Sequence, residues 1–307
     1  MSQTQRLLLI APQNMTHTPA FDRAAALSLA MQMPLHIVAF DYLQALAVAG
    51  LFAPEQISLA RDGYLQTHRE WLAEQAALMR KHGVEVTSEV VWVQHPYEEI
   101  LHFVNEMSLA LIIKDAQEES ALKRVFFTPL DWQLLRDCPV PVHLVTNAVN
   151  PKPHNVLAII DVLRSEDQDH VFNDQIIDAA AKLASVCGAT LELVHVYDWT
   201  AVYAQDIGFG ALPLAVGIYE TLGSAQHEAF AAIAERHGVA PQNRHFIEGV
   251  PLTSICDFAA EHRTDVIVMG TVQHKGLNKL LGTTAEQLLH RAPCSVLAIK
   301  PGRVLQS

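Results

Sequence analysis

The sequence predicts an α/β protein made of two tandem domains, each an open, five-stranded, mostly parallel sheet with helices on both faces. Three observations indicate this fold class. Short runs of Val, Ile and Leu alternate with Ala-rich helical patterns, as in parallel strands joined by crossover helices. The chain of 307 residues has the length of about two domains. The strand segments of the first half also recur, in the same order, in the second, which indicates an internal repeat.

The repeat is visible in four pairs of segments. Listed by their places in the two halves, they are 6–11 with 155–160, 34–42 with 190–198, 109–114 with 264–269, and 134–145 with 288–299. Helical spacing of apolar residues predicts helices over 21–31, 68–79, 171–186 and 224–234. Prolines and asparagines over 147–154 are typical of a linker. We therefore expect domains at 1–146 and 155–301.

Composition argues against several classes of protein. A formal net charge of -12 and a pI near 5.7 disfavour direct nucleic-acid binding, because an acidic surface repels phosphate backbones. No apolar run reaches the ~18 residues of a membrane span, and the first residues lack a secretory pattern. We therefore expect a cytoplasmic protein without membrane contact. The four cysteines form no CxxC pair, so we expect reduced thiols.

The strongest local motif is a glycine-containing loop between a predicted strand and a predicted helix of the second half. It runs from Gly270 through Gly276 to Gly282, followed by Thr283 and Thr284. Backbone N–H groups and a helix dipole make such a loop a good phosphate site. It is neither a Walker A nor a Rossmann fingerprint. The same glycines would also suit a turn that needs positive φ angles.

Both halves resemble the universal stress protein family, whose members have an adenine nucleotide alpha hydrolase-like fold. The resemblance covers nearly the whole chain, and segments 91–96 and 125–135 resemble the tandem, E-type members in particular. It implies that the last strands, 140–145 and 295–299, pair within one chain, and that the tandem protein can form a homodimer.

The resemblance also implies an adenine nucleotide site, for ATP or AMP with Mg²⁺, in the second half. Listed by position, the matching residues are Asp161, Val196, Met269, Gly270, Gly282, Thr283 and Thr284. Gln273 stands where the family has a glycine, and the loop is one residue shorter than the family pattern. A side chain there hinders close approach of phosphate, whereas the nearby His274 and Lys275 could compensate.

The first half departs further from this pattern. Its loop, 114–129, contains no glycine, and its first strand ends Ala11-Pro12-Gln13 without an aspartate. Acidic residues in the loop would repel phosphates, so we expect no nucleotide here. Apolar segments follow the second strand in both halves, at 43–53 and 207–218. They are interpreted as lids, as walls of a cavity for an apolar ligand, as association surfaces, or as segments packed on their own domain.

Histidines number 16, and several have carboxylates nearby in sequence. These are His68 near Glu70, His95 near Glu98 and Glu99, and His262 near Glu261. Without an HxxxH or HExxH motif we predict no metal site, although a weak divalent site is left open.

No catalytic motif is recognisable, so no catalytic residue is named. The resemblance implies a stress-resistance protein, acting against DNA damage, oxidants or starvation, that senses ATP or AMP in its second domain. Two alternatives stay open: a weak ATPase in the second domain, and a carrier of a small apolar or lipid-like ligand in the first.

Overall fold

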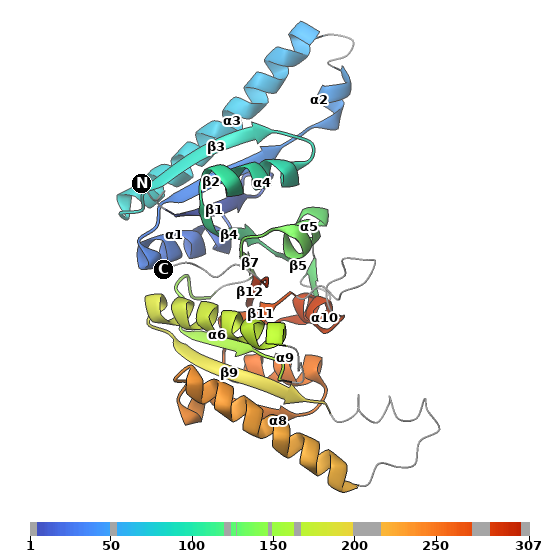
Figure 1. The fold of residues 1–307 in the computed structure, drawn as a ribbon. Coiled ribbons are helices and arrows are strands. Elements are labelled where there is room, and N and C mark those ends of the chain that lie inside the picture. Colours follow the sequence, from blue (N-terminus) through green and yellow to red (C-terminus); the bar gives the residue numbers. More distant parts are fainter. Residues whose placement is uncertain are drawn as a thin grey trace. The chain divides into compact units, whose positions relative to one another are not determined.

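The computed structural model describes residues 5–49, 54–119, 124–126, 128–146, 149–162, 167–198, 216–271 and 283–301. They form two compact units. One contains the described residues of Met1–Gln117 and Phe127–Lys152, and the other those of Glu118–Phe126 and Pro153–Leu305. Figure 1 shows that each unit is a sheet flanked by helices.

The elements of the two halves follow the same alternation of strand and helix. In chain order, the first half contains β1 (Arg6–Ala11), α1 (Pro19–Met31), β2 (Leu35–Asp41), α2 (Gln44–Ala49), α3 (Pro54–Lys81), β3 (Val86–Trp92), α4 (Pro96–Glu106), β4 (Leu109–Asp115), β5 (Gln117–Glu119), β6 (Arg124–Phe126), α5 (Pro129–Asp137) and β7 (Val142–Val145). The second contains β8 (Asn155–Ile159), α6 (Asp167–Cys187), β9 (Thr190–Tyr197), α8 (Val216–Arg236), β10 (Arg244–Glu248), α9 (Pro251–Glu261), β11 (Val266–Gly270), α10 (Thr283–Arg291) and β12 (Ser295–Ile299).

Strand order is the same in both sheets. It is β3-β2-β1-β4-β7 in the first unit and β10-β9-β8-β11-β12 in the second, and neighbouring strands run parallel. The predicted fold class is thereby confirmed. In each sheet the chain order reverses between the first and fourth strands, at β1/β4 and at β8/β11. Ligands of open α/β sheets bind at the carboxyl ends of the strands at such a switch point.

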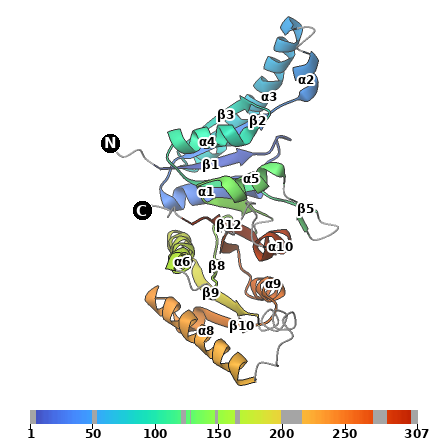
Figure 2. The same ribbon diagram turned by 45° about the vertical axis from the view of Figure 1, so that its right-hand side comes forward.

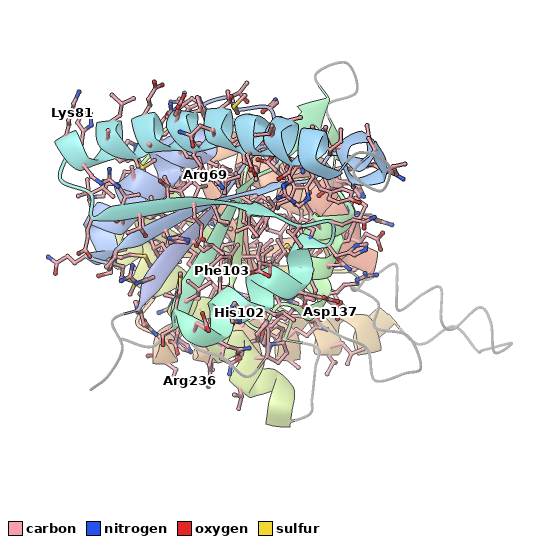
Figure 3. All side chains as sticks on the ribbon, turned by 90° about the horizontal axis from the view of Figure 1, so that it is seen from above. Arg69, Lys81, His102, Phe103, Asp137 and Arg236 are labelled. Atoms are coloured by element: carbon pink, nitrogen blue, oxygen red, sulfur yellow. The ribbon has the colours of Figure 1, made fainter. Side chains whose placement is uncertain are left out.

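Helices cover both faces of each sheet. Figure 2 shows α6 and α8 on one side of the second sheet, with α9 and α10 on the other. In Figure 3, α3, which ends at Lys81, covers one face of the first sheet, and α4, which carries Phe103, covers the other. This two-sided cover explains why whole strands are buried: every residue of β2 and of β12 is buried.

Helix α3 is longer than the sequence predicted. It spans 28 residues from Pro54, whereas apolar periodicity indicated only 68–79. The physical reason is that no residue from Ile57 to Tyr64 is buried, and Leu59 is 76% exposed. Deeper burial begins at Leu65 and continues at Leu72 and Ala76, so only this part of the helix needs an apolar stripe.

The apolar segment 43–53 forms the short helix α2 over its described part. This helix contacts α3 and has no buried residue. Leu43 and Val48 are exposed, so the segment's apolar side chains stay partly in water. Most of the corresponding segment, 207–218, lies outside the described residues.

Among the described helices none has both the length and the hydropathy for crossing a membrane.

Candidate functional site

The predicted nucleotide site falls on three neighbouring strands of the second unit. Strand β8 lies between β9 and β11, and Ala158 pairs with both Leu193 and Val268. Because the three strands are parallel, the residues at their carboxyl ends lie along one edge of the sheet. Asp161, Val196 and Met269–Gly270 are therefore brought to this edge, at the switch point.

Asp161 follows β8, and its backbone is fixed by a buried side chain of α6. The Asn173 Nδ2 group donates to the Asp161 carbonyl oxygen at 2.8 Å, and the Asp161 N–H donates to Asn173 Oδ1 at 3.3 Å. Asn173 is only 4% exposed. These two hydrogen bonds fix the backbone conformation of Asp161 just after the strand. The Asp161 residue itself is half-buried.

The preceding residue is held from β9. His195 is buried, and its Nδ1 lies 3.2 Å from the Ile160 carbonyl oxygen. A carbonyl oxygen only accepts, so Nδ1 carries the hydrogen. The other ring nitrogen lies 3.1 Å from Gln226 Oε1 of α8. A neutral His195 therefore requires the Gln226 amide to be turned so that its NH₂ group donates.

Val196 and Met269 are both buried, at 9% and 5% exposure. The next residue of β9, Tyr197, is also buried and stacks on Phe246.

Gly270 has a packing role that the sequence did not reveal. A Cβ atom at this position would lie 2.4 Å from Phe172 Cε1 and Cζ, and 3.0 Å from Ile176 Cδ1. Both neighbours belong to α6 and are buried. Its φ is not among the positive values of the chain. Close helix–strand packing is thus sufficient to explain why a glycine stands here.

The remaining residues of the predicted site are only partly described. Gln273 and Gly282 lie outside the described residues. Thr283 and Thr284 form the first turn of α10, and their side chains lie outside the description. The helix thus begins at Thr283, directly after Gly282, two residues before the start at Ala285 that the sequence predicted.

The corresponding edge of the first unit is occupied by its own charged groups. Lys114, at the end of β4, places its Nζ 2.9 Å from Asp131 Oδ1. Asp131 also closes a capping box with Thr128: the Thr128 N–H donates to Asp131 Oδ2 at 2.7 Å, and the Asp131 N–H donates to Thr128 Oγ1. Asp131 is 1% exposed. The Asp131 carboxylate thus caps the N-terminus of α5, where an anionic ligand would otherwise bind.

A second feature of the first unit escaped the sequence reasoning. At the end of β2, Asp41 Oδ2 lies 2.6 Å from His68 Nδ1 of α3, and both residues are buried. Burial raises the pKa of Asp41, and the charge of His68 acts against this rise. The Tyr64 ring covers His68 at a centroid distance of 4.4 Å. The expected neighbour of His68 was Glu70, but α3 turns His68 toward the sheet.

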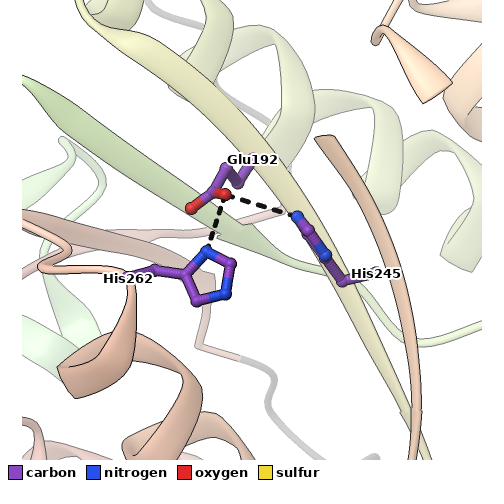
Figure 4. Close-up of side chains that lie close together, drawn as sticks. All are labelled: Glu192, His245 and His262. Carbon is purple, nitrogen blue, oxygen red and sulfur yellow. Dashed lines mark hydrogen bonds and ion pairs between the residues drawn. The ribbon is translucent and has the colours of Figure 1, made fainter. Parts of the chain in front are cut away.

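A third polar group lies in the second unit, away from the switch point. His262 Nδ1 is 2.9 Å from Glu192 Oε1, and His245 Nε2 is 3.4 Å from the same oxygen, as Figure 4 shows. Burial lowers the pKa of His245 although the Glu192 carboxylate acts to raise it. Here too the partner differs from the sequence neighbour, since His262 meets Glu192 of β9 rather than Glu261.

The repeated strand order defines a tandem α/β protein with two open, parallel sheets. A family model for the universal stress protein family matches residues 6–146 and 155–300. The chain therefore belongs to the universal stress protein family, with two copies of its domain.

The tandem arrangement is shared by similar proteins. Universal stress protein E of Salmonella typhi is 28% identical over 306 residues, which covers 98% of this chain and 96% of that protein. The protein of the same description from Escherichia coli is also 28% identical, over 98% of this chain and 95% of its own. A putative universal stress protein from Pseudomonas aeruginosa has the same fold, with a TM-score of 0.73, 24% identity, and coverage of 98% of this chain and 94% of its own.

Proposed function

We propose that this tandem universal stress protein supports stress resistance without catalysis, and that its second unit alone binds an adenine nucleotide. The stress role, against DNA damage, oxidants or starvation, is inferred from the family. The asymmetry between the two switch points is the observation that carries the nucleotide assignment. In the second unit Asp161 is presented by a fixed backbone, whereas in the first the helix N-terminus is held by Asp131.

The first unit is unsuited to a phosphate for an electrostatic reason. The free N–H groups and the dipole at a helix N-terminus favour one anion, and in α5 that anion is the Asp131 carboxylate. Lys114, the cation beside it, is paired with the same carboxylate. A phosphate would have to displace a buried carboxylate from both partners, or approach it against charge repulsion.

The second unit has a separate group suited to each part of a nucleotide: the ribose or its Mg²⁺, the base and the phosphates. The Asp161 carboxylate suits a ribose hydroxyl or the water shell of Mg²⁺. The buried end of β9 at Val196 suits the base. The N-terminus of α10, at Thr283 and Thr284, suits the phosphates. Because packing already accounts for Gly270, the phosphate assignment depends on Gly282 and α10.

Calorimetric titration with ATP and with AMP, each with Mg²⁺, tests the proposal on the full chain. We expect saturable heat from the unaltered protein, and at least a tenfold loss of affinity in Gly282→Val and in Asp161→Ala. The matched control is Gln13→Ala at the end of β1, which removes a hydrogen bond to the Phe40 carbonyl and should leave the titration unchanged. No heat from the unaltered protein, or equal affinity in all variants, overturns the assignment.

ATP hydrolysis is the alternative that the same preparation tests. Release of inorganic phosphate from ATP, abolished by Asp161→Ala, would replace a binding role by a catalytic one. Binding without phosphate release supports the sensor.

An apolar ligand in the first unit is a second candidate function, favoured by the surroundings of α2. Leu43 and Val48 are exposed there, and Tyr42 and Tyr64 both lie against Trp92, with ring centroids 5.6 and 6.2 Å away. Mass spectrometry of the native protein tests it. A co-purified lipid-like molecule that is lost in Leu43→Ser/Val48→Ser supports this function, and a ligand-free spectrum contradicts it.

A further inference from the structure

Three side chains of the second unit converge on one point with the chemistry of a metal site. Glu192 comes from β9, His245 from β10, and His262 from the end of α9. One ligand atom from each lies within 4.8 Å of the other two. In Figure 4 both imidazole rings direct a nitrogen toward the Glu192 carboxylate. Imidazole nitrogen and carboxylate oxygen are the ligands that Zn²⁺ prefers besides thiolate.

The spacing of the donor atoms matches a tetrahedral ion. Bonds of about 2.05 Å at the tetrahedral angle separate two ligand atoms by roughly 3.3 Å. The separations between the Glu192 oxygen and the two histidine nitrogens are 2.9 and 3.4 Å, one just below and one just above this value. Small side-chain rotations are therefore enough to place an ion between the three donors.

The cluster has an unfilled bonding requirement. His245 Nε2 is buried, and among the described residues no well-formed hydrogen bond reaches it. Its 3.4 Å separation from Glu192 exceeds the usual length of an N–H···O bond. A buried polar atom in this state is costly, and a metal ion would satisfy it through the lone pair of a neutral imidazole.

Phe258 packs against both imidazole rings, and the His262 side chain remains partly exposed to water. Phe258 of α9 stacks on His262 at a centroid distance of 3.8 Å and lies 4.6 Å from the His245 ring. Glu192 and His245 have side chains 12% and 19% exposed, whereas that of His262 is 36% exposed. The site is thus closed on its inner side and open to water through His262.

The first unit also has a polar cluster between its second and third strands, β2 and β3, but its histidine makes different contacts. His36 of β2 uses both ring nitrogens, one at 2.8 Å from Thr87 Oγ1 and one at 2.8 Å from Glu89 Oε1. Phe103 of α4 lies beside it. With both nitrogens satisfied by protein groups, His36 has no lone pair directed at a shared point. The metal geometry is therefore particular to the second unit.

We propose that Glu192, His245 and His262 bind a divalent transition-metal ion of the Zn²⁺ type, with water as the fourth ligand. The ion links β9, β10 and the end of α9. Glu192 is the third residue of β9, which ends at Tyr197, so this site is separate from the proposed nucleotide site at the carboxyl end of the strand. Nucleotide binding and metal binding can therefore succeed or fail independently.

Titration of the metal-stripped full chain with Zn²⁺, followed by calorimetry, tests the proposal. We expect one ion per chain at this site and an affinity loss of at least about 10–100-fold in His262→Gln, since losing even an outer partner of a ligand has that effect. Glu192→Gln keeps the shape of the side chain and should weaken binding similarly. The control is His102→Gln, an exposed histidine of α4 that also contacts a carboxylate, Glu106, at 3.2 Å.

Co²⁺ gives a second readout that a merely structural cluster would not produce. Tetrahedral Co²⁺ absorbs strongly in the visible range, and we expect this band in the unaltered protein and in His102→Gln but not in His262→Gln. Cys256 is a free, half-buried cysteine of α9. A near-ultraviolet sulfur-to-cobalt band that is lost in Cys256→Ser would instead place the ion on a thiolate and overturn the assignment. Equal Zn²⁺ affinity in His262→Gln, Glu192→Gln and the unaltered protein, with all folded by circular dichroism, overturns it as well.

Discussion

Replacing Gly270 with alanine should destabilise the second unit through one identifiable contact. The new Cβ would lie 2.4 Å from two ring carbons of Phe172, and 3.0 Å from Ile176 Cδ1. Phe172 and Ile176 are 5% and 3% exposed, so neither can move outward into water. Overpacking of this kind costs about 1–3 kcal/mol. For a unit of this size each kcal/mol lowers Tm by roughly 2–4 °C, which gives a fall on the order of 2–12 °C.

A double-mutant cycle assigns this cost to its cause. Phe172→Ala alone should cost about 3–5 kcal/mol because it leaves a cavity. If the ring is what Gly270 accommodates, adding Gly270→Ala to Phe172→Ala costs nothing further, and its methyl group partly fills the space. The coupling energy is then close to the full cost of Gly270→Ala, within the 0.5–3 kcal/mol range known for residues in contact.

Urea unfolding followed by circular dichroism measures the free energies of the four proteins. Gly63→Ala is the matched control, because Gly63 lies inside helix α3 and, among the described residues, no group beyond its chain neighbours and the local helix backbone lies within 4 Å of a Cβ added there. It should stabilise the protein by about 0.4–1 kcal/mol. Unchanged stability of Gly270→Ala, or simple additivity with Phe172→Ala, would refute the packing role of Gly270.

Three further predictions concern side chains that hold the strand ends and helices. Asp131→Asn keeps an acceptor for the α5 cap but removes the carboxylate that faces Lys114. Urea unfolding should therefore show a loss of about 1.5–3 kcal/mol, which should be smaller in Asp131→Asn/Lys114→Met. Asn173→Leu should cost about 1–3 kcal/mol, because buried backbone groups of Asp161 lose their partner, and should weaken ATP binding by calorimetry. Burial acts to raise the pKa of Asp174, but hydrogen bonds from His237 and Arg236 outweigh it and the pKa is lowered. The stability that Asp174 adds is therefore complete above the ordinary aspartate pKa and is lost as pH falls through its lowered value, so the Tm difference from Asp174→Asn should shrink below about pH 4.

The fold was predictable because its signals are local and repeated. Short apolar runs indicated the positions of the strands. The recurrence of these runs in the second half indicated that strands and helices alternate in the same order in both halves. The end of β8 just before Asp161 and a helix start within a few residues of Gly282 followed from the same pattern, since a strand end and a helix start are properties of short segments. Because the domain is duplicated, most predicted elements could also be checked against a counterpart in the other half of the sequence.

Contacts between distant segments were not predictable in this way. His68 and His262 have carboxylates beside them in sequence, yet their partners are Asp41 of β2 and Glu192 of β9. Each contact joins a helix to a strand of the sheet that it covers, so sequence proximity is a poor guide to pairing. Gly270 illustrates the same point, because its constraint comes from Phe172 of α6.

The two halves differ in how polar groups are satisfied in two regions of the fold, and this difference is consistent with different tasks on a duplicated scaffold. At the switch point, the first unit satisfies its helix N-terminus with Asp131, while the second presents Asp161. Between the second and third strands, His36 is fully hydrogen-bonded, while His245 is not. In each case the first unit neutralises a polar position with its own side chains, which adds stability. In the second unit, by contrast, the buried Nε2 of His245 has no well-formed hydrogen bond among the described residues, and a bound ion would supply the missing interaction.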